Sequence, residues 1–167
     1  MAARMLSLLA GLALVSGIHA QAMDPGGAVP KLTLSNLYVE GAYTTVSYVC
    51  ARRFADEAPR WNGSLAAWKA RHAAVLAEFR DLDAQLSAAV KAAPQATSLS
   101  QEELMALRTQ PALLMLGSLA EARDSKARDL CDNLLSRMDN DDAQAQASTE
   151  QARSAARELL KQFRAGR

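Results

Sequence analysis

The chain has 167 residues, of which 50% are hydrophobic and 22% are charged, and its formal net charge is +1. A dedicated nucleic-acid-binding protein derives its affinity from a strongly basic surface, so this balanced charge argues against nucleic acid as a partner. The length is typical of a single domain, and a chain of about 150 residues can bury a substantial hydrophobic core.

Residues 1–22 have the pattern of a secretory signal peptide. Arg4 supplies a positive charge, residues 5–18 form an uncharged apolar stretch, and the small residues up to Ala22 suit signal peptidase. We therefore expect cleavage between Ala22 and Met23. An apolar run of ~10 to 14 residues is short for a bilayer that needs about 20, so we expect no membrane insertion after cleavage. The predicted location is periplasmic or secreted.

Two different segments follow the predicted cleavage site. Residues 23–34 are rich in glycine and proline and contain few large apolar side chains, so we expect a flexible lead-in. Residues 35–57 carry several β-branched side chains, which favour strands. No second strand-like segment follows, and an isolated strand is not stable. We therefore predict a helix that ends before Pro59.

The clearest periodic pattern of the chain lies in residues 61–89. Apolar or aromatic residues recur there in alternating steps of four and three, which is the seam of helices that pack side by side. The pattern predicts one continuous helix, which Pro94 terminates. The seam consists of Trp61, Leu65, Trp68, His72, Val75, Phe79, Leu82, Leu86 and Ala89.

A strong helix start follows at Ser100. Ser100 and Glu103 have the spacing of a capping box, and Leu99 and Leu104 occupy the two positions of a hydrophobic staple. We expect Pro111 to kink or break this third helix, because proline lacks a backbone N–H. The apolar spacing then predicts a helix over residues 112–138, which the acidic run at 139–142 interrupts.

The last predicted helix covers residues 143–167. Its composition favours a helix, but its apolar stripe of Ala152, Ala156, Leu159 and Phe163 is thin, so we expect it to be the least firmly docked. Together these segments predict an all-α domain over residues 35–167, an up-and-down bundle of about four helices.

Cys50 and Cys131 are the only cysteines of the chain. Disulfides form and persist in exported proteins, so we predict that these two residues are bonded to each other. The bond would close a loop of roughly 80 residues, which stabilises by about 4 kcal/mol in the chain-entropy model. The alternative is a pair of reactive thiols, but no C-x-x-C motif supports that function.

The sequence contains few of the groups that common catalytic or metal sites need. His72 is the only histidine beyond the predicted signal peptide, and its seam position favours a structural role over that of a general base. One histidine is too few for the usual zinc sites, and the C-x-x-C-H motif of covalent haem is missing. We therefore predict no enzymatic activity, no metal site and no cofactor.

Two charged segments have alternative interpretations. The acidic run at 139–142 resembles the start of a calcium loop, with Glu150 at the twelfth position, but Ala143 and Gln144 replace a ligand and the essential glycine. We interpret it as an interhelical turn. One side of the last helix carries four basic residues, which suit either an anionic partner or, as we prefer, a solvated face. These residues are Arg153, Arg157, Lys161 and Arg164.

The stretch from Val49 to His72 carries a weak motif formed by Cys50, Phe54, Pro59, Trp68 and Arg71. In this stretch the chain resembles a loose group of small exported proteobacterial proteins. The resemblance implies export and a helical fold, and it brings no activity, ligand or catalytic residue with it.

The signal peptide, the helical seam and the missing catalytic groups predict an exported, non-enzymatic interaction protein with an unknown protein partner. An inhibitor or immunity protein against an envelope toxin and a small chaperone are two forms of this function. The alternative is a periplasmic bundle that binds a small molecule or cofactor in its interior. Trp61, Trp68 and His72 would then lie near the ligand.

Overall fold

The computed structural model describes residues 31–95, 99–140 and 143–165, and every regular element within these ranges is helical. The predicted all-α class is confirmed, whereas the prediction of about four helices is wrong. The helices are α1 (Lys31–Ser35), α2 (Val39–Arg53), α3 (Ala58–Arg71), α4 (Ala73–Ala92), α5 (Gln101–Glu121), α6 (Asp124–Asp139) and α7 (Ala143–Ala165), with the short 3-10 turns η1 (Asn36–Tyr38) and η2 (Ala55–Glu57) before and after α2. The predicted signal peptide and its cleavage site at Ala22 and Met23 lie outside the described residues.

The helical domain begins earlier than predicted. Helix α1 starts at Lys31, within the segment 23–34 that the sequence predicts as a flexible lead-in. Leu34 is only 1% exposed and Leu37 is 5% exposed, so this first turn belongs to the hydrophobic core. Two leucines in one short segment are enough to dock it once three other helices provide a site, which the local sequence does not reveal.

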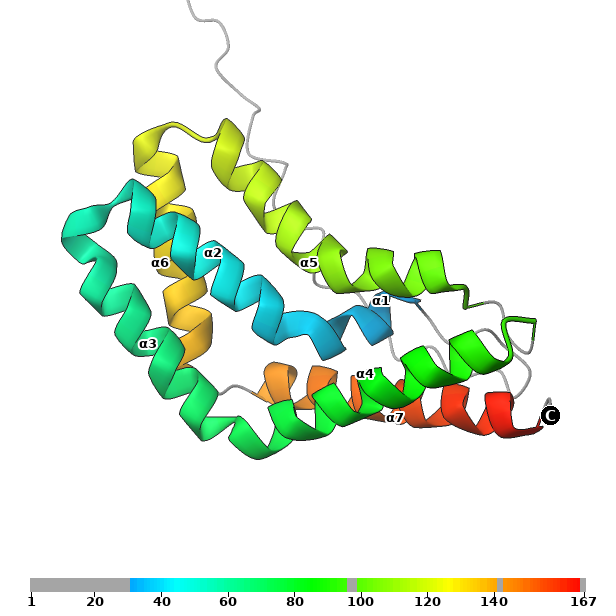
Figure 1. The fold of residues 1–167 in the computed structure, drawn as a ribbon. Coiled ribbons are helices and arrows are strands. Elements are labelled where there is room, and N and C mark those ends of the chain that lie inside the picture. The colour runs from blue at the N-terminus through cyan, green and yellow to red at the C-terminus, as the bar shows by residue number, and fades with distance from the viewer. Residues whose placement is uncertain (1–30, 96–98, 141–142, 166–167) are drawn as a thin grey trace, which may run out of the picture.

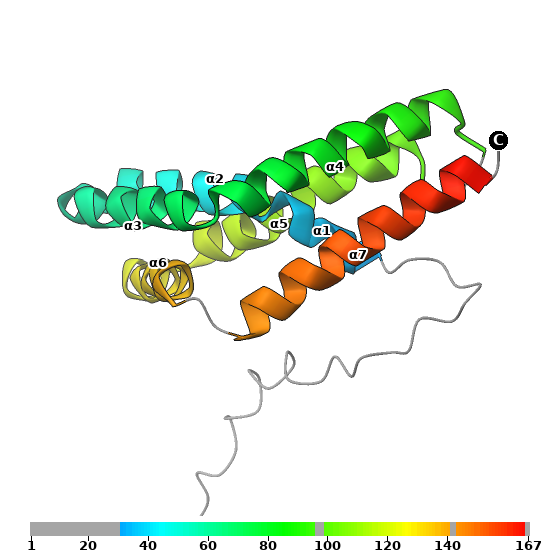
Figure 2. The same cartoon turned by 90° about the horizontal axis from the view of Figure 1, so that it is seen from below.

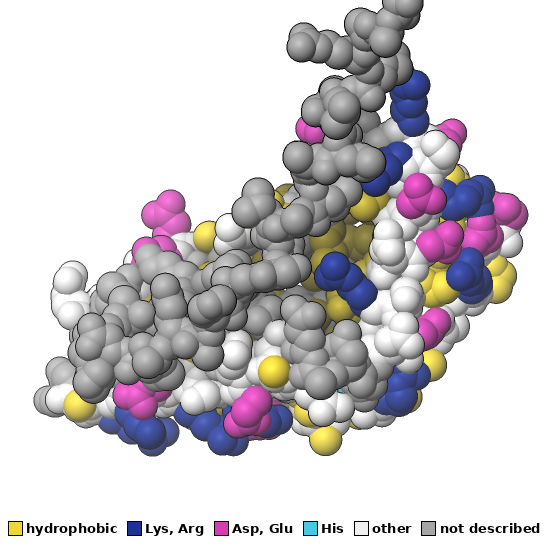
Figure 3. Space-filling view, turned by 180° about the vertical axis from the view of Figure 1, so that it is seen from behind, with side chains coloured by type: hydrophobic (Ala, Val, Ile, Leu, Met, Phe, Trp, Pro, Cys, Tyr) yellow, Lys and Arg dark blue, Asp and Glu magenta, His cyan; other side chains and the backbone are white. Residues whose placement is uncertain are grey.

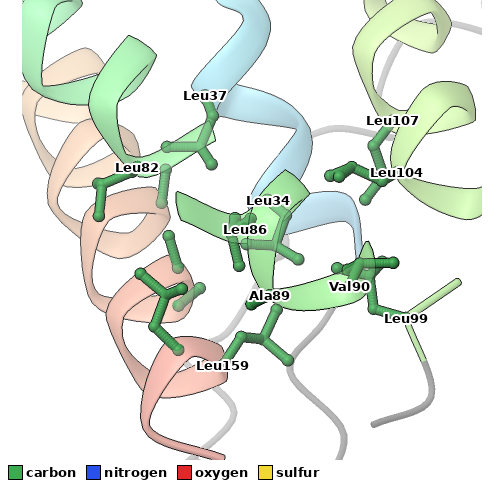
Figure 4. Packing of buried hydrophobic residues seen from close by; sticks show 14 of the residues in the cluster. Leu34, Leu37, Leu82, Leu86, Ala89, Val90, Leu99, Leu104, Leu107 and Leu159 are labelled. Carbon is green, nitrogen blue, oxygen red and sulfur yellow. The ribbon is translucent and has the colours of Figure 1, made fainter. Parts of the chain in front are cut away.

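The buried side chains form two separate cores, which we call the first and the second core. The first core joins α1, η1, α4, the N-terminal half of α5, and α7, and Figure 4 shows Leu34 and Leu86 near its centre. The second core joins α2, α3, the C-terminal half of α5, and α6, and it contains both tryptophans and both cysteines. Figure 1 shows the two groups of helices at opposite ends of the molecule, with α2 and α5 extending between them. Figure 2 shows that α6 and α7 lie on the same side of the layer formed by α2, α3 and α4.

The predicted continuous helix over residues 61–89 is wrong, because the chain bends at His72. The backbone of His72 has φ −102° and ψ 12°, which separates α3 from α4. Hydrogen bonds from the amide of His72 to the carbonyl of Trp68 (3.0 Å) and from the amide of Leu76 to the carbonyl of His72 (2.9 Å) still bridge the bend. Trp61 and Trp68, before the bend, are buried in the second core and Leu65 packs against it, whereas the seam residues from Phe79 onward are buried in the first core.

Helix α5 differs from its prediction at both Pro111 and its C-terminus. The capping box is confirmed, because the amide of Glu103 donates to Ser100 Oγ (3.1 Å) and the amide of Ser100 donates to Glu103 Oε2 (2.8 Å). The helix is not broken at Pro111, since it continues to Glu121, and the kink predicted as the alternative stays a prediction. Leu107 before the proline packs into the first core and Leu119 after it packs into the second, so tertiary packing holds the helix together.

The predicted helix over residues 112–138 is also wrong, because α5 ends at Glu121 and α6 begins at Asp124. Arg53 of α2 occupies this junction. Its guanidinium group donates to the backbone carbonyls of Leu119 and Ala122, each at 2.7 Å, and binds the Asp124 carboxylate at 2.8 Å. The last carbonyls of a helix lack partners within the helix, so Arg53 satisfies them and fixes the point where α5 stops.

Helix α7 is docked more firmly than predicted. Ala152 and Ala156 are fully buried and Phe163 is 1% exposed, and all three belong to the first core. The small alanine side chains let α7 approach α4 and α1 closely. The narrow apolar stripe in the sequence does not reveal this close approach. Arg153 and Arg157 of α7 also bind Glu78 of α4 at 2.9 Å and 2.7 Å. The expectation of a loosely docked last helix is therefore wrong.

The structure places the predicted cysteine pair at disulfide-bond distance. Cys50 Sγ and Cys131 Sγ lie 2.05 Å apart, and the two Cα atoms are separated by 5.9 Å. Both residues are buried in the second core, where the pair joins α2 to α6. A bond between them would link the second core only, because residues 50 and 131 both belong to it.

Candidate functional site

The outward face of α5 exposes large apolar side chains. Met105 is 49% exposed, Leu113 is 61% exposed and Leu114 is 64% exposed, whereas most large apolar residues in the described part of the chain are buried or half-buried. Tyr48 of α2, at 63%, is the other highly exposed one there. The inward face of α5 buries Leu104, Leu107 and Leu119, so this helix is apolar on opposite sides.

The outward face of α5 also lacks charge. From Met105 to Ala120 the sequence contains one charged residue, Arg108. Its guanidinium group binds the Asp83 carboxylate of α4, and its Nη1 also contacts the sulfur of Met105 (3.2 Å) at the edge of this face. We call the exposed surface formed by Met105, Ala106, Thr109, Gln110, Leu113, Leu114 and Gly117 the neutral face of α5.

Other helices present charged residues at their exposed positions. Examples are Arg80 and Asp81 of α4, Asp129 and Arg137 of α6, and Lys161 of α7. Figure 3 shows acidic and basic side chains next to one another along the edges of the molecule. Mixed charge of this kind favours solubility. Helix α5 departs from this pattern, as does the middle of α2, where the exposed residues Gly41, Thr44 and Tyr48 are uncharged.

A partly buried polar cluster lies where η1, α4 and α5 meet. The Tyr38 hydroxyl donates to Asp83 Oδ1 (2.7 Å), and Arg108 Nη2 donates to Asp83 Oδ1 and Oδ2, each at 2.9 Å. Arg108 Nη2 also donates to Ser87 Oγ. The Asp83 carboxylate therefore receives both a phenol and a guanidinium group, which fixes all three side chains.

The cluster shifts the titration of its members. Burial raises the pKa of Tyr38 well above its usual value, and the neighbouring Asp83 carboxylate raises it further by hydrogen bonding and charge. Burial alone would lower the pKa of Arg108, but the hydrogen bonds and the attraction of Asp83 outweigh it and raise the pKa. Tyr38 therefore stays protonated at physiological pH, which makes it a hydrogen-bond donor and an unsuitable general base.

A groove of about 260 Å³ lies next to this cluster. Leu37, Leu76 and Phe79 provide its apolar part, and Phe79 and Leu76 belong to different cores. The groove therefore lies at the junction between the two cores. Polar groups line the rest of it, including Tyr38, Asp83, Arg108, Glu40 and Arg80. We call it the junction groove.

A second groove of about 420 Å³ lies between α4 and α7. The pair formed by Arg157 Nη2 and Glu78 Oε1 (2.7 Å) lies in it, and Lys161 binds Glu158 at 3.3 Å. Arg153 is held by Glu78 and Glu150, and although burial lowers its pKa, these two carboxylates raise it overall. Three of the four basic residues of the last helix are thus paired, which supports their interpretation as a solvated face.

The aromatic residues that the sequence suggests as a ligand site lie within the second core. Trp61 is 1% exposed and Trp68 is 8% exposed, and neither lines the two grooves described above. Trp68 packs edge-on against Tyr43 with ring centres 4.9 Å apart, and it stacks on His72 at 5.1 Å. The structure brings Trp68 and His72 together, but as a packed aromatic group. The indole N–H of Trp61 finds no hydrogen-bond acceptor within the described residues.

The acidic run at 139–142 is the remaining metal-site candidate of the sequence. Residues 141–142 of the acidic run lie outside the described ranges. Within those ranges, no three acidic, histidine or cysteine side chains converge as metal ligands would. No helix in the described ranges combines the length and the apolarity that a membrane span requires.

Sequence reasoning missed both the polar cluster and the neutral face. The partners of Asp83, Tyr38 and Arg108, lie 45 and 25 residues away in the chain, so no local spacing indicates them. The neutral face did leave a signal, because residues 105–120 contain a single charge in a chain that is 22% charged. A long uncharged run on a predicted surface helix is therefore informative.

Comparison with known proteins finds no match for this chain. No protein-family model matches the chain, and no curated protein and no solved structure matches it either. Any functional assignment depends on the residues described above.

Proposed function

We propose that this protein is an exported, non-enzymatic interaction protein that binds a protein partner through the neutral face of α5. The observation that carries the proposal is the exposure of Leu113 and Leu114, at 61% and 64%, on a face without charge. Helices that are apolar on all sides are normally buried on all sides. Helix α5 is covered on its inward side alone.

The composition of this face resembles the centre of a protein interface. Interface centres are depleted of charged residues and contain methionine and aromatic or other apolar side chains. The exposed leucines do not contribute to either core, so the fold gives no reason for them. A partner that covers Leu113 and Leu114 would remove from water the apolar surface that folding leaves exposed.

Export is part of the proposal and depends on the first residues of the chain. Residues 1–22 have the signal-peptide pattern, and the distance between Cys50 and Cys131 is that of a bond that an oxidising compartment preserves. Non-reducing peptide mapping of material isolated from the periplasm or the medium tests both statements. A linked Cys50–Cys131 peptide and an N-terminus at Met23 are expected. Free thiols in exported protein would contradict the predicted bond.

The experiment that tests the proposed function is capture of a partner from a periplasmic extract on the oxidised protein that begins at Met23. We expect a protein to be retained by the natural sequence and lost with Leu113→Glu, which puts a charge at the centre of the neutral face. The matched control is Tyr48→Glu, because Tyr48 is equally exposed but lies on α2. Equal capture by all three proteins, or capture by none together with a turnover activity, would contradict the proposal.

The captured protein also distinguishes the two forms of this function. An inhibitor or immunity protein should bind one enzyme tightly and block its activity. A small chaperone should instead suppress aggregation of several unfolded clients, and Leu113→Glu should weaken that effect.

The junction groove supports a second candidate function, the binding of a small molecule. The supporting observation is that the apolar side chains of Leu37, Leu76 and Phe79 lie beside hydrogen-bonding groups in this groove. This combination is typical of ligand sites. Gly41 lines the groove, and a side chain added there meets no atom within 4 Å of its Cβ. Gly41→Leu should therefore fill the groove, whereas Gly63→Leu on α3 is a control with the same free space. A retained ligand in native mass spectra that disappears with Gly41→Leu alone is expected, and a bare mass counts against this candidate.

A further inference from the structure

The centre of the neutral face combines a projecting side chain with small neighbours. Leu113 lies on the same side of α5 as Ala106, Thr109 and Gly117, because residues three, four or seven positions apart share a helix face. All four are exposed, and a Cβ added to Gly117 would meet no atom within 4 Å. The surface thus offers one projecting leucine beside shallow positions that another leucine can occupy.

We infer that the neutral face of α5 binds the same face of a second copy of this protein, with the two α5 helices antiparallel. The inference rests on the proposed function, because it names the partner for the surface assigned there. A partner with charged residues would bury them against a face that offers no counter-charge, which is costly. The matching surface must itself be uncharged, and on this molecule the neutral face of α5 meets that requirement.

An antiparallel arrangement about a two-fold axis makes the interface self-complementary. If the helices cross between Thr109 and Gln110, Leu113 of each copy lies over Ala106 of the other. Met105 then lies beside Leu114 of the other copy. Each projecting leucine meets a small side chain, and each outer apolar residue meets another apolar residue.

The charged ends of α5 remain outside the contact in this arrangement. The neutral face from Met105 to Gly117 is about 18 Å long at 1.5 Å per residue, so Glu121 lies beyond its end. A single helix face of this length buries less than the roughly 800 Å² per partner of a standard interface. We therefore expect a weak dimer that forms reversibly and depends on concentration, which leaves the protein partly monomeric when dilute.

Sedimentation equilibrium of the oxidised protein that begins at Met23 tests this inference. The measurements extend to about 1 mM, because at that concentration even a millimolar dissociation constant leaves measurable dimer. We expect an average mass that rises toward the dimer for the natural sequence. Leu113→Glu should weaken the association at least tenfold, and Tyr48→Glu should leave it unchanged. Circular dichroism of each variant shows that the helices are retained.

Two further variants test the arrangement itself. Ala106→Glu and Leu113→Lys should each weaken the dimer, but a mixture of the two proteins should restore it, because residue 106 of one copy faces residue 113 of the other. A general loss of folding would not produce this rescue. Failure of the mixture to associate while the natural protein dimerises would overturn the antiparallel arrangement.

The outcomes separate this inference from the proposed function. A monomer at every concentration, together with a captured partner that Leu113→Glu releases, would overturn the second-copy inference and leave the proposed function in place. A monomer that captures no partner would contradict both. Unchanged self-association of Leu113→Glu would place any dimer contact elsewhere and overturn the inference.

Discussion

The two hydrophobic cores are stabilised in different ways. The first core consists mainly of leucine and alanine side chains and brings together chain segments as distant as Leu34 and Phe163. The second core contains Trp61 and Trp68, and the Cys50–Cys131 pair lies within it. The first core therefore depends on close packing and on surface ion pairs such as Arg153–Glu78, whereas the second core contains two cysteines at bonding distance.

The bend at His72 and the proline inside α5 both lie near the boundary between the cores. The chain bends at His72 where α3 passes into α4, and Pro111 lies between the part of α5 that contacts the first core and the part that contacts the second. The junction groove lies at the same boundary. The domain thus contains two packing units, and we expect their stabilities to respond differently to substitutions in one or the other.

Removal of the disulfide should have the largest effect and should act through the second core. The loop between the cysteines spans 81 residues. Replacing both cysteines with alanine is expected to lower the free energy of unfolding by about 4 kcal/mol, less any compensation in the unfolded chain. Denaturant unfolding of the oxidised natural protein and the double variant measures the difference. No difference would show that the pair contributes nothing to the second core.

Leu86→Ala should strongly destabilise the first core. Leu86 has no exposed surface, and truncation of a buried leucine costs about 3 kcal/mol from lost contacts and the resulting cavity. Leu113→Ala on the neutral face is the matched control, with an expected change within about 0.5 kcal/mol. Thermal unfolding of both proteins compares them. Equal destabilisation would mean that Leu113 is not an exposed side chain in solution.

Loss of the Asp83 carboxylate should destabilise the first core to a smaller extent. Asp83→Ala leaves the Tyr38 hydroxyl and the Arg108 guanidinium group partly buried without their acceptor, at an expected cost of about 2 kcal/mol. Asp81→Ala is the control, since Asp81 is exposed and accepts from Gln85 of the same helix. If the two variants unfold at the same denaturant concentration, the polar cluster around Asp83 does not stabilise the fold.

The raised pKa of Tyr38 predicts a loss of stability at alkaline pH. The folded protein keeps the Tyr38 proton at pH values where the unfolded chain, with an ordinary tyrosine pKa of about 10, has lost it. The unfolded state then binds fewer protons, so the free energy of unfolding falls as the pH rises above about 10. Tyr38→Phe should flatten this decline, and Tyr48→Phe should not. Parallel pH profiles for all three proteins would contradict the assignment.

The N-terminal cap of α5 should have the smallest of these effects. Ser100→Ala removes the side-chain acceptor for the amide of Glu103 and should cost about 1 kcal/mol. Because α5 contacts both cores, hydrogen exchange should become faster in segments of both cores. Faster exchange confined to one core would show that the cap of α5 stabilises that core alone.

Local patterns in the sequence were sufficient for the features that depend on neighbouring residues. The capping box at Ser100 and Glu103 and the helical nature of α2 and α7 follow from capping, periodicity and propensity. The pairing of Cys50 with Cys131 follows from there being two cysteines, and its formation in exported protein stays a prediction.

The features that depend on distant residues could not be predicted. The seam over residues 61–89 has one unbroken period, yet its two halves face different cores, and only the position of the other helices decides this. Continuation of α5 through Pro111 depends on packing at both of its ends. The partners of Asp83 come from η1 and α5, and no spacing within α4 indicates them.

Hydrogen exchange of individual peptides, before and after reduction of the Cys50–Cys131 bond, tests the two-core description most directly. We predict that reduction accelerates exchange in α6 and in the C-terminal half of α2, while α7 and the C-terminal half of α4 keep their protection. Equal acceleration in α6 and α7 would show that the molecule has one cooperative core, and would contradict the description of two.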